Sequence, residues 1–188
     1  IIKVESSGHI YALADAGPVN LPWSVRKSMV KSHFLSTKEE AVTLAKSLLA
    51  KGHTVSLGLS QVNDRNLKSL GLSIEQVFDP CTNLSAGGRI LTDFYRRASR
   101  EFGPGEQALR AAISAYNSGS WERGEANGYV GQVYKAAGIV PDLKVGKGGR
   151  GVAVASAAPV ARSAEQWWES RAELLRQARE SELESSKE

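Results

Sequence analysis

The stretch DPCTNLSAGGRILTDFYRRASREFG, residues 79–103, decides the fold because it predicts a single long helix. Asp79 is a typical residue before a helix, Pro80 stands at the first helical position, and Gly103 follows the end. Apolar side chains recur at helical spacing along one side: they are Leu84, Ile90, Leu91, Phe94, Ala98 and Phe102. The chain of 188 residues has room for one well-buried domain around this helix and for an appendage.

Further helices are predicted on both sides of this stretch. Upstream, Ser36 with Glu39 and Thr37 with Glu40 form capping-box patterns ahead of an apolar helical repeat that Gly52 ends. The other predicted helices are the last turns of one at 1–7, two short ones at 63–70 and 73–78, one at 105–119 and one at about 128–137.

Two segments have the character of strands. HIYAL (9–13) is rich in apolar and aromatic residues, and TVSLGLSQV (54–62) alternates apolar residues with small or polar ones. The segment GPVNLPW (17–23) is rich in turn residues and is expected to be irregular. The predicted fold class is therefore α+β, mostly α, with a small β element.

The C-terminal part of the chain has a different composition. VGKGGRGVAVASAAPVAR (145–162) is rich in glycine, alanine and valine without periodicity, which is typical of a linker. From Ser163 an amphipathic helix is predicted, with Trp167 and Trp168 on its apolar side. We therefore expect a domain at 1–140, a linker at 141–162 and a C-terminal helix at 163–188, whose tryptophans pack on the body or a partner rather than bind sugar.

The bulk composition is that of a soluble globular protein, with 41% hydrophobic and 23% charged residues. No apolar run approaches the roughly 20 residues that a membrane span needs. The net charge of +4 would suit an anionic partner, but basic residues with interleaved aromatics do not cluster, so nucleic acid is not expected. His9, His33 and His53 lack metal-ligand spacing, and we expect no metal and no cofactor.

Three short motifs stand in a fixed order: VESSG (4–8), GLSQVN (58–63) and AYNSG (115–119). FDPCTNLSAGGRIL (78–91) and NGYVGQV (127–133) accompany them. Over about residues 1–140 this set resembles the soluble lytic transglycosylase family, and within it the peptidoglycan-cutting component of VirB-type type IV secretion systems. The resemblance implies a goose-lysozyme-like domain and places the protein in the periplasm, and the missing initiator methionine suggests a mature or shortened form.

The resemblance also implies a reaction and its residues. The family cleaves the β-1,4 bond between N-acetylmuramic acid and N-acetylglucosamine in peptidoglycan strands and leaves a 1,6-anhydro sugar. By motif position Glu5 is the catalytic acid and Ser6 lies beside it. Gln61 and Asn63 line the cleft, the Tyr116 hydroxyl positions the acid, and Asn117 lies next to it. The family pattern is changed at two places, where Ser60 replaces a methionine and His9 and Ile10 replace an Asn-Pro pair.

The chemistry of glycosidic cleavage supports an acid in this position. A carboxyl group protonates the leaving oxygen near neutral pH only if its pKa is raised, and burial beside apolar groups raises it. A hydrolase needs a second carboxylate, for which the candidates are poor: Asp79 is a helix cap, Asp64 fits a first helical turn, and Asp15 lies in an expected loop. The alternatives are a muramidase that uses water and a non-catalytic peptidoglycan-binding assembly protein.

Two expectations concern other contacts of the chain. Cys81, the single cysteine, has two interpretations: it is a buried small apolar residue in the helix, or it has lost a disulfide partner, because the resemblance implies that this position commonly pairs with an upstream cysteine. The C-terminal helix is expected to contact other secretion-system proteins.

Overall fold

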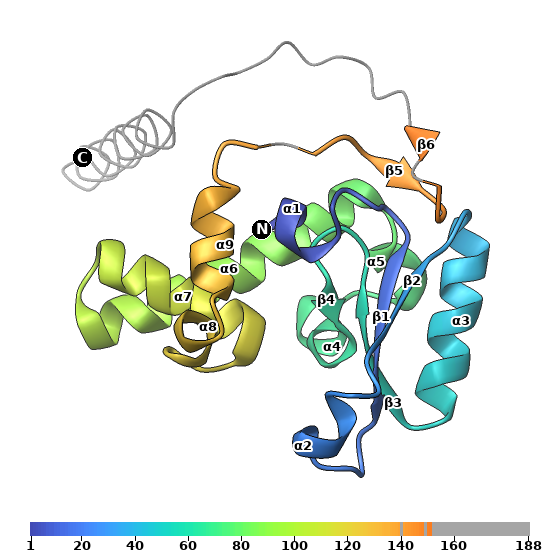
Figure 1. The fold of residues 1–188 in the computed structure, drawn as a ribbon, viewed down its shortest axis with the longest axis horizontal. Helices are drawn as coiled ribbons and strands as arrows, with labels where there is room; N and C mark the ends of the chain where they lie inside the picture. Colours follow the sequence, from blue (N-terminus) through green and yellow to red (C-terminus); the bar gives the residue numbers. More distant parts are fainter. Residues whose placement is uncertain (140, 149, 152–188) are drawn as a thin grey trace, which may run out of the picture. The chain divides into compact units, whose positions relative to one another are not determined.

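A computed structural model describes residues 1–139, 141–148 and 150–151, and apart from residues 137–139 these belong to one compact unit. Figure 1 shows its two parts, a small sheet and a group of helices. The expected C-terminal helix at 163–188 lies outside the described residues.

The sheet has four antiparallel strands in the order β2-β1-β3-β4. They are β1 (Ala12–Pro18), β2 (Lys31–Phe34), β3 (His53–Leu57) and β4 (Val62–Asn63). Leu13 of the central strand β1 lies opposite His33 on one side and Leu57 on the other. The first predicted strand segment (9–13) is only partly confirmed, because residues 9–11 precede the strand and β1 runs on to Pro18, into the segment expected to be irregular. The second segment is confirmed but is divided into β3 and β4 by a turn at residues 58–61.

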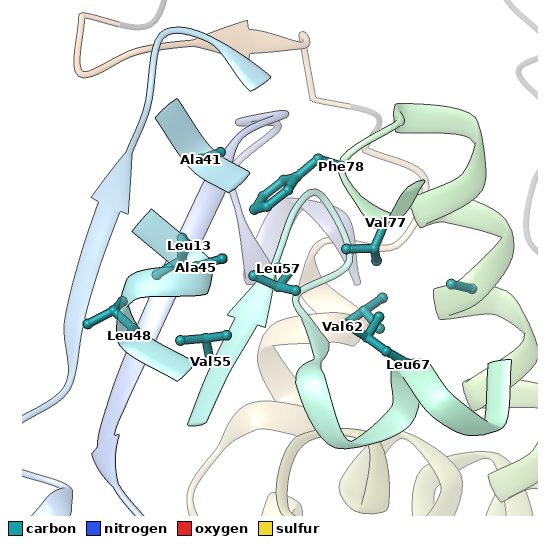
Figure 2. Close-up of a cluster of buried hydrophobic side chains, with 11 residues drawn as sticks. Leu13, Ala41, Ala45, Leu48, Val55, Leu57, Val62, Leu67, Val77 and Phe78 are labelled. Atoms are coloured by element: carbon teal, nitrogen blue, oxygen red, sulfur yellow. The ribbon is translucent and has the colours of Figure 1, made fainter. Parts of the chain in front are cut away.

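One apolar core joins the sheet to the helices beside it. Helix α3 (Lys38–Ala50) begins where the Thr37 hydroxyl accepts the Glu40 amide, as its capping pattern predicts. Figure 2 shows its buried side chains packed against the strands and the short helices that follow. The core consists of Leu13, Ala41, Ala45, Leu48, Val55, Leu57, Val62, Leu67, Val77, Phe78 and Ala86.

The long helix α6 (Pro80–Phe102) connects this core to the helical part. Its predicted ends are confirmed, because the Asp79 carboxylate accepts the Thr82 amide at 2.8 Å and Gly103 follows with a φ of 78°. The other helices are α1 (Ile2–Glu5), α2 (Trp23–Arg26), the 3-10 turn η1 (Asp64–Asn66), α4 (Leu67–Leu70), α5 (Ile74–Val77), α7 (Glu106–Ser118), α8 (Arg123–Ala126) and α9 (Tyr129–Lys135).

Several short elements were not predicted from the sequence. Helix α2 begins at the last residue of the segment expected to be irregular, and strand β2 follows after it. Helix α8 precedes the helix expected at about 128–137. A two-stranded ribbon, β5 (Lys144–Val145) with β6 (Arg150–Gly151), falls inside the expected linker. None of the helices in the described ranges is long and apolar enough to cross a membrane.

Candidate active site

Glu5 of the VESSG motif is hydrogen-bonded to a tyrosine from the far end of the domain. Glu5 is the last residue of α1, and Tyr129 is the first residue of α9. The Tyr129 hydroxyl donates a hydrogen bond to Glu5 Oε1, across 124 residues of sequence. The two short helices pack against each other, which brings both side chains to one place.

The surroundings of Glu5 are apolar on one side. Ile1 and Val4 pack against a buried cluster formed by Ile113, Tyr129, Val130 and Val133. Burial raises the pKa of the Glu5 carboxyl above its ordinary value, while the hydrogen bond from the Tyr129 hydroxyl acts in the opposite direction. Glu5 as a whole residue is partly buried, and its carboxyl is desolvated.

Tyr116 does not hold the acid, and the expectation that its hydroxyl does so is wrong. That hydroxyl donates to the backbone oxygen of Ser60 at 2.7 Å. Burial, and after it the negative charge of Glu5, raises the pKa of Tyr116, so the ring lies within electrostatic reach of the acid. Tyr116 therefore ties helix α7 to the turn at 58–61 on one side of the site.

The turn at 58–61 carries Gln61 and is held in place by hydrogen bonds from its own side chain and from a buried residue of α6. Gln61 has a φ of 48°, and its side-chain amide donates to the Gly58 oxygen at 2.9 Å. The buried Asn83 of α6 accepts the Ser60 amide at 2.7 Å and donates to the oxygens of Leu57 and Val77 at 2.9 and 2.8 Å. Sequence reasoning missed Asn83, although it lies within the FDPCTNLSAGG motif.

Ser60, where the family has a methionine, faces the long helix. A Cβ atom on Gly87 would lie 2.6 Å from the Ser60 Cβ and 3.0 Å from the Tyr116 hydroxyl. A side chain at position 87 would therefore not fit without a shift, because the two residues are buried where they meet. Gly87 thus allows the long helix to approach Ser60 closely.

The other expected site residues make local contacts. Ser6 is buried, and its hydroxyl accepts the Gly8 amide at 3.3 Å. Asn63 accepts the Arg65 amide at 3.2 Å, as a cap of η1. No hydrogen bond in the described part of the chain joins either residue to Glu5.

Asn117 is linked to the acid indirectly. Its side-chain oxygen accepts from the Asn127 amide group at 2.9 Å, and the Asn127 oxygen accepts the backbone amide of Tyr129 at 3.0 Å. Tyr129 in turn holds Glu5. The motif NGYVGQV, which served only as a marker in the sequence, thus supplies two residues of the site.

Each of the three candidates for a second carboxylate is hydrogen-bonded to protein groups other than Glu5. Asp15 is buried in β1 rather than in a loop, and it accepts the Gly17 amide and faces His53 Nδ1, each at 2.8 Å. Asp64 accepts the Thr54 hydroxyl at 2.5 Å and the Val55 amide at 2.8 Å. With Asp79 capping α6, all three carboxylates have structural roles.

A segment from the expected linker covers the loop that follows Glu5. The Lys144 amide donates to the Gly8 oxygen at 2.8 Å, and the Ile10 amide donates to the Lys144 oxygen at 2.9 Å. Gly8 has a φ of 87°, and a Cβ atom there would lie 2.2 Å from the Asp142 oxygen. Residues 142–146 are therefore part of the domain rather than of a linker.

His9 and Cys81 make no hydrogen bond to Glu5 in the described part of the chain. The His9 ring packs on Phe34 with 4.4 Å between ring centres, and burial lowers its pKa. Cys81 is an exposed free thiol. Among the residues that the structure describes, no three histidine, cysteine or acidic side chains are grouped to hold a metal ion.

A mostly helical domain with a small antiparallel sheet and a partly buried glutamic acid at their junction defines the lysozyme-like class. Residues 1–138 match the model of the transglycosylase SLT domain, and the chain belongs to this family. The resemblance stated from the five motifs is confirmed, and so is the fold class.

Two similar relatives both carry the name virB1. The chain is 42% identical over 128 residues to type IV secretion system protein virB1 of Brucella abortus, covering 66% of this chain and 48% of the relative. It is 41% identical over 106 residues to protein virB1 of Agrobacterium fabrum, covering 55% of this chain and 42% of the relative. The chain thus spans about half the length of these curated relatives, and no solved structure matches it.

Proposed function

We propose that the protein is a lytic transglycosylase that cleaves the β-1,4 bond between N-acetylmuramic acid and N-acetylglucosamine in peptidoglycan. The observation that carries the proposal is the partly buried Glu5, whose raised pKa and tyrosine partner suit a general acid. The substrate-binding roles of Ser6, Gln61, Asn63, Tyr116 and Asn117 are part of this proposal.

The reaction needs one carboxyl group in two successive roles. Protonated Glu5 gives its proton to the glycosidic oxygen as the bond from that oxygen to carbon 1 breaks, with an oxocarbenium-like state on the muramic sugar. The carbon-6 hydroxyl of the same sugar then attacks carbon 1, and the Glu5 carboxylate takes its proton. Because the attacking hydroxyl is tethered to the reacting ring, the second step benefits from a high effective concentration.

The products distinguish this reaction from hydrolysis. The structural bonds of Asp15, Asp64 and Asp79 leave none of them free to activate water beside Glu5, so the sugar's own hydroxyl is the expected nucleophile. Digestion of purified peptidoglycan should release fragments that end in 1,6-anhydro-N-acetylmuramic acid, each lighter by one water than the hydrolytic product. Mass spectrometry of the fragments measures this directly.

Two other results would point to the alternatives. Fragments with reducing N-acetylmuramic acid ends would identify a muramidase and contradict the ring-closing mechanism. Binding to peptidoglycan without any released fragment would identify a non-catalytic assembly protein.

The Tyr129 hydroxyl should control the pH dependence of cleavage. Since Glu5 must be protonated to act as the acid, activity should fall as pH rises through its raised pKa. The hydrogen bond from Tyr129 lowers that pKa. Tyr129→Phe should therefore move the alkaline limb of the pH–rate profile to higher pH, while the maximal rate falls roughly tenfold because the carboxyl loses its positioning partner.

The matched control is Tyr134→Phe. Tyr134 lies on α9, as Tyr129 does, and its hydroxyl donates to Glu106 of α7 rather than to Glu5. This substitution should leave the profile unchanged. An alkaline limb that stays in place or moves to lower pH in Tyr129→Phe would contradict the assigned contact.

The names of the relatives place them in type IV secretion. We extend the proposal to a periplasmic role in which this protein opens the cell wall locally for assembly of such an apparatus or of a conjugation machine. Contacts with other secretion-system proteins through residues 163–188, the segment expected from the sequence to be helical, belong to the same proposal, and a pull-down with and without that segment tests them.

A further inference from the structure

The loop between β1 and β2, residues 19–30, exposes a group of apolar side chains. Of the seven large hydrophobic residues that are exposed in the described part of the chain, five lie in this loop. Trp23 is the most exposed of them at 54%. The five residues are Val19, Trp23, Val25, Met29 and Val30. We call this group the loop patch.

The loop is an ordered structure that holds these side chains outward. The Arg26 guanidinium turns back toward the chain and donates to the oxygens of Leu21 and Ala16 at 3.0 and 3.2 Å. It also lies over the Trp23 ring, 5.5 Å from the ring centre. The Val19 amide donates to the Gly52 oxygen at 2.9 Å, which anchors the start of the loop to the end of α3. The exposure of the patch is therefore built into the fold.

The chain segment that carries the loop patch has charges of a single sign. No acidic residue occurs between Asp15 and Glu39, and this stretch contains Arg26, Lys27 and Lys31. Lys27 and Lys31 are exposed, whereas Asp15 is buried and faces His53. A partner for this surface should combine negative charge with an apolar layer.

The loop patch lies away from the candidate active site. Figure 1 shows α2 at one end of strands β1 and β2, and α1, which ends in Glu5, near the other end of β1. A strand of seven residues is roughly 23 Å long, so a broad partner can cover the loop without covering Glu5.

We propose that the loop patch docks on the surface of an anionic phospholipid membrane. Tryptophan prefers the boundary between headgroups and acyl chains, and valine and methionine side chains gain by entering it. Lysines beside them attract anionic headgroups, each worth about 1 kcal/mol near such a surface. A glycan is a poorer match, because Trp23 is the one aromatic face in the loop patch, and the other four side chains offer a sugar neither an aromatic face nor a strong hydrogen bond. This inference does not depend on the proposed enzymatic activity.

Vesicle binding of the full chain tests the charged part of the proposal. The protein should sediment with vesicles of phosphatidylethanolamine and phosphatidylglycerol, and only weakly with vesicles of phosphatidylcholine. Lys27→Glu with Lys31→Glu should weaken binding to the anionic vesicles about 25-fold or more. The control pair Lys68→Glu with Arg96→Glu makes the same change in net charge at exposed positions elsewhere and should weaken it far less.

A second pair of variants tests the apolar part. Trp23→Ser should weaken vesicle binding about tenfold, whereas Leu84→Ser, at an exposed position on α6, should not change it. Thermal unfolding and peptidoglycan cleavage in solution, measured in parallel, should be the same for the loop variants as for the unchanged protein.

Four outcomes would overturn the proposal: no binding of the unchanged protein to anionic vesicles, equal binding to phosphatidylcholine, equal weakening by both charge pairs, or unaltered binding of Trp23→Ser. Capture of an acidic protein through this loop without vesicle binding would also overturn it and would assign the surface to a protein partner.

Discussion

Glu5→Gln is expected to lower the rate of peptidoglycan cleavage about 100-fold or more, the scale of a lost general acid. Glutamine keeps the size of the side chain and can still accept the hydrogen bond from Tyr129. It cannot transfer a proton to the leaving oxygen or take one from the attacking hydroxyl. Release of soluble fragments from purified peptidoglycan, followed over time, measures the loss.

The control for this substitution is Glu101→Gln, at an exposed position near the end of α6. It removes the same charge away from the site and should leave the rate unchanged. Both variants should still bind peptidoglycan in sedimentation experiments. Turnover of Glu5→Gln close to that of the unchanged protein would exclude Glu5 as the acid.

Asn83→Ala is expected to destabilise the domain by roughly 3 kcal/mol or more. The side chain is almost fully buried and satisfies three backbone groups, the oxygens of Leu57 and Val77 and the amide of Ser60. Removing it leaves these groups without partners, and an unpaired buried polar group costs about 1–3 kcal/mol. Urea unfolding measures the difference in free energy.

Ser85→Ala on the exposed side of the same helix serves as the control and should change the free energy of unfolding by less than about 0.5 kcal/mol. Since the turn at 58–61 depends on Asn83, any folded fraction of the Asn83→Ala protein should also cleave peptidoglycan more slowly. A loss of stability no larger than that of the control would show that water replaces the amide group.

Most of the secondary structure could be predicted from local signals. Caps such as Thr37, Ser73 and Asp79 set the starts of helices through contacts within three residues, and each forms in the structure as the sequence indicates. Strand β2 was missed because Lys31, Ser32 and His33 lack the apolar alternation of a half-buried strand. It forms because it pairs with β1, a contact that the local sequence does not encode.

The site was predictable only in part. Glu5 could be placed by its motif. Which tyrosine bonds to it, Tyr116 or Tyr129, depends on how α9 packs on α1 and how α7 packs on the turn at 58–61. Such long-range packing leaves no periodic signal in the sequence. The loop assignment of Asp15 failed for the same reason, since its burial follows from pairing of β1 on both sides and from the contact with His53.

The pairing of the two ends of the domain sets an order of events during synthesis. During synthesis Tyr129 and Lys144, which hold the acid and the loop after it, are made more than a hundred residues later than Glu5. Contacts across such distances form after local ones, because a large loop must close first. Until then Glu5 is an ordinary solvated carboxyl group with an ordinary pKa. An incomplete chain therefore carries the acid but not its reactivity.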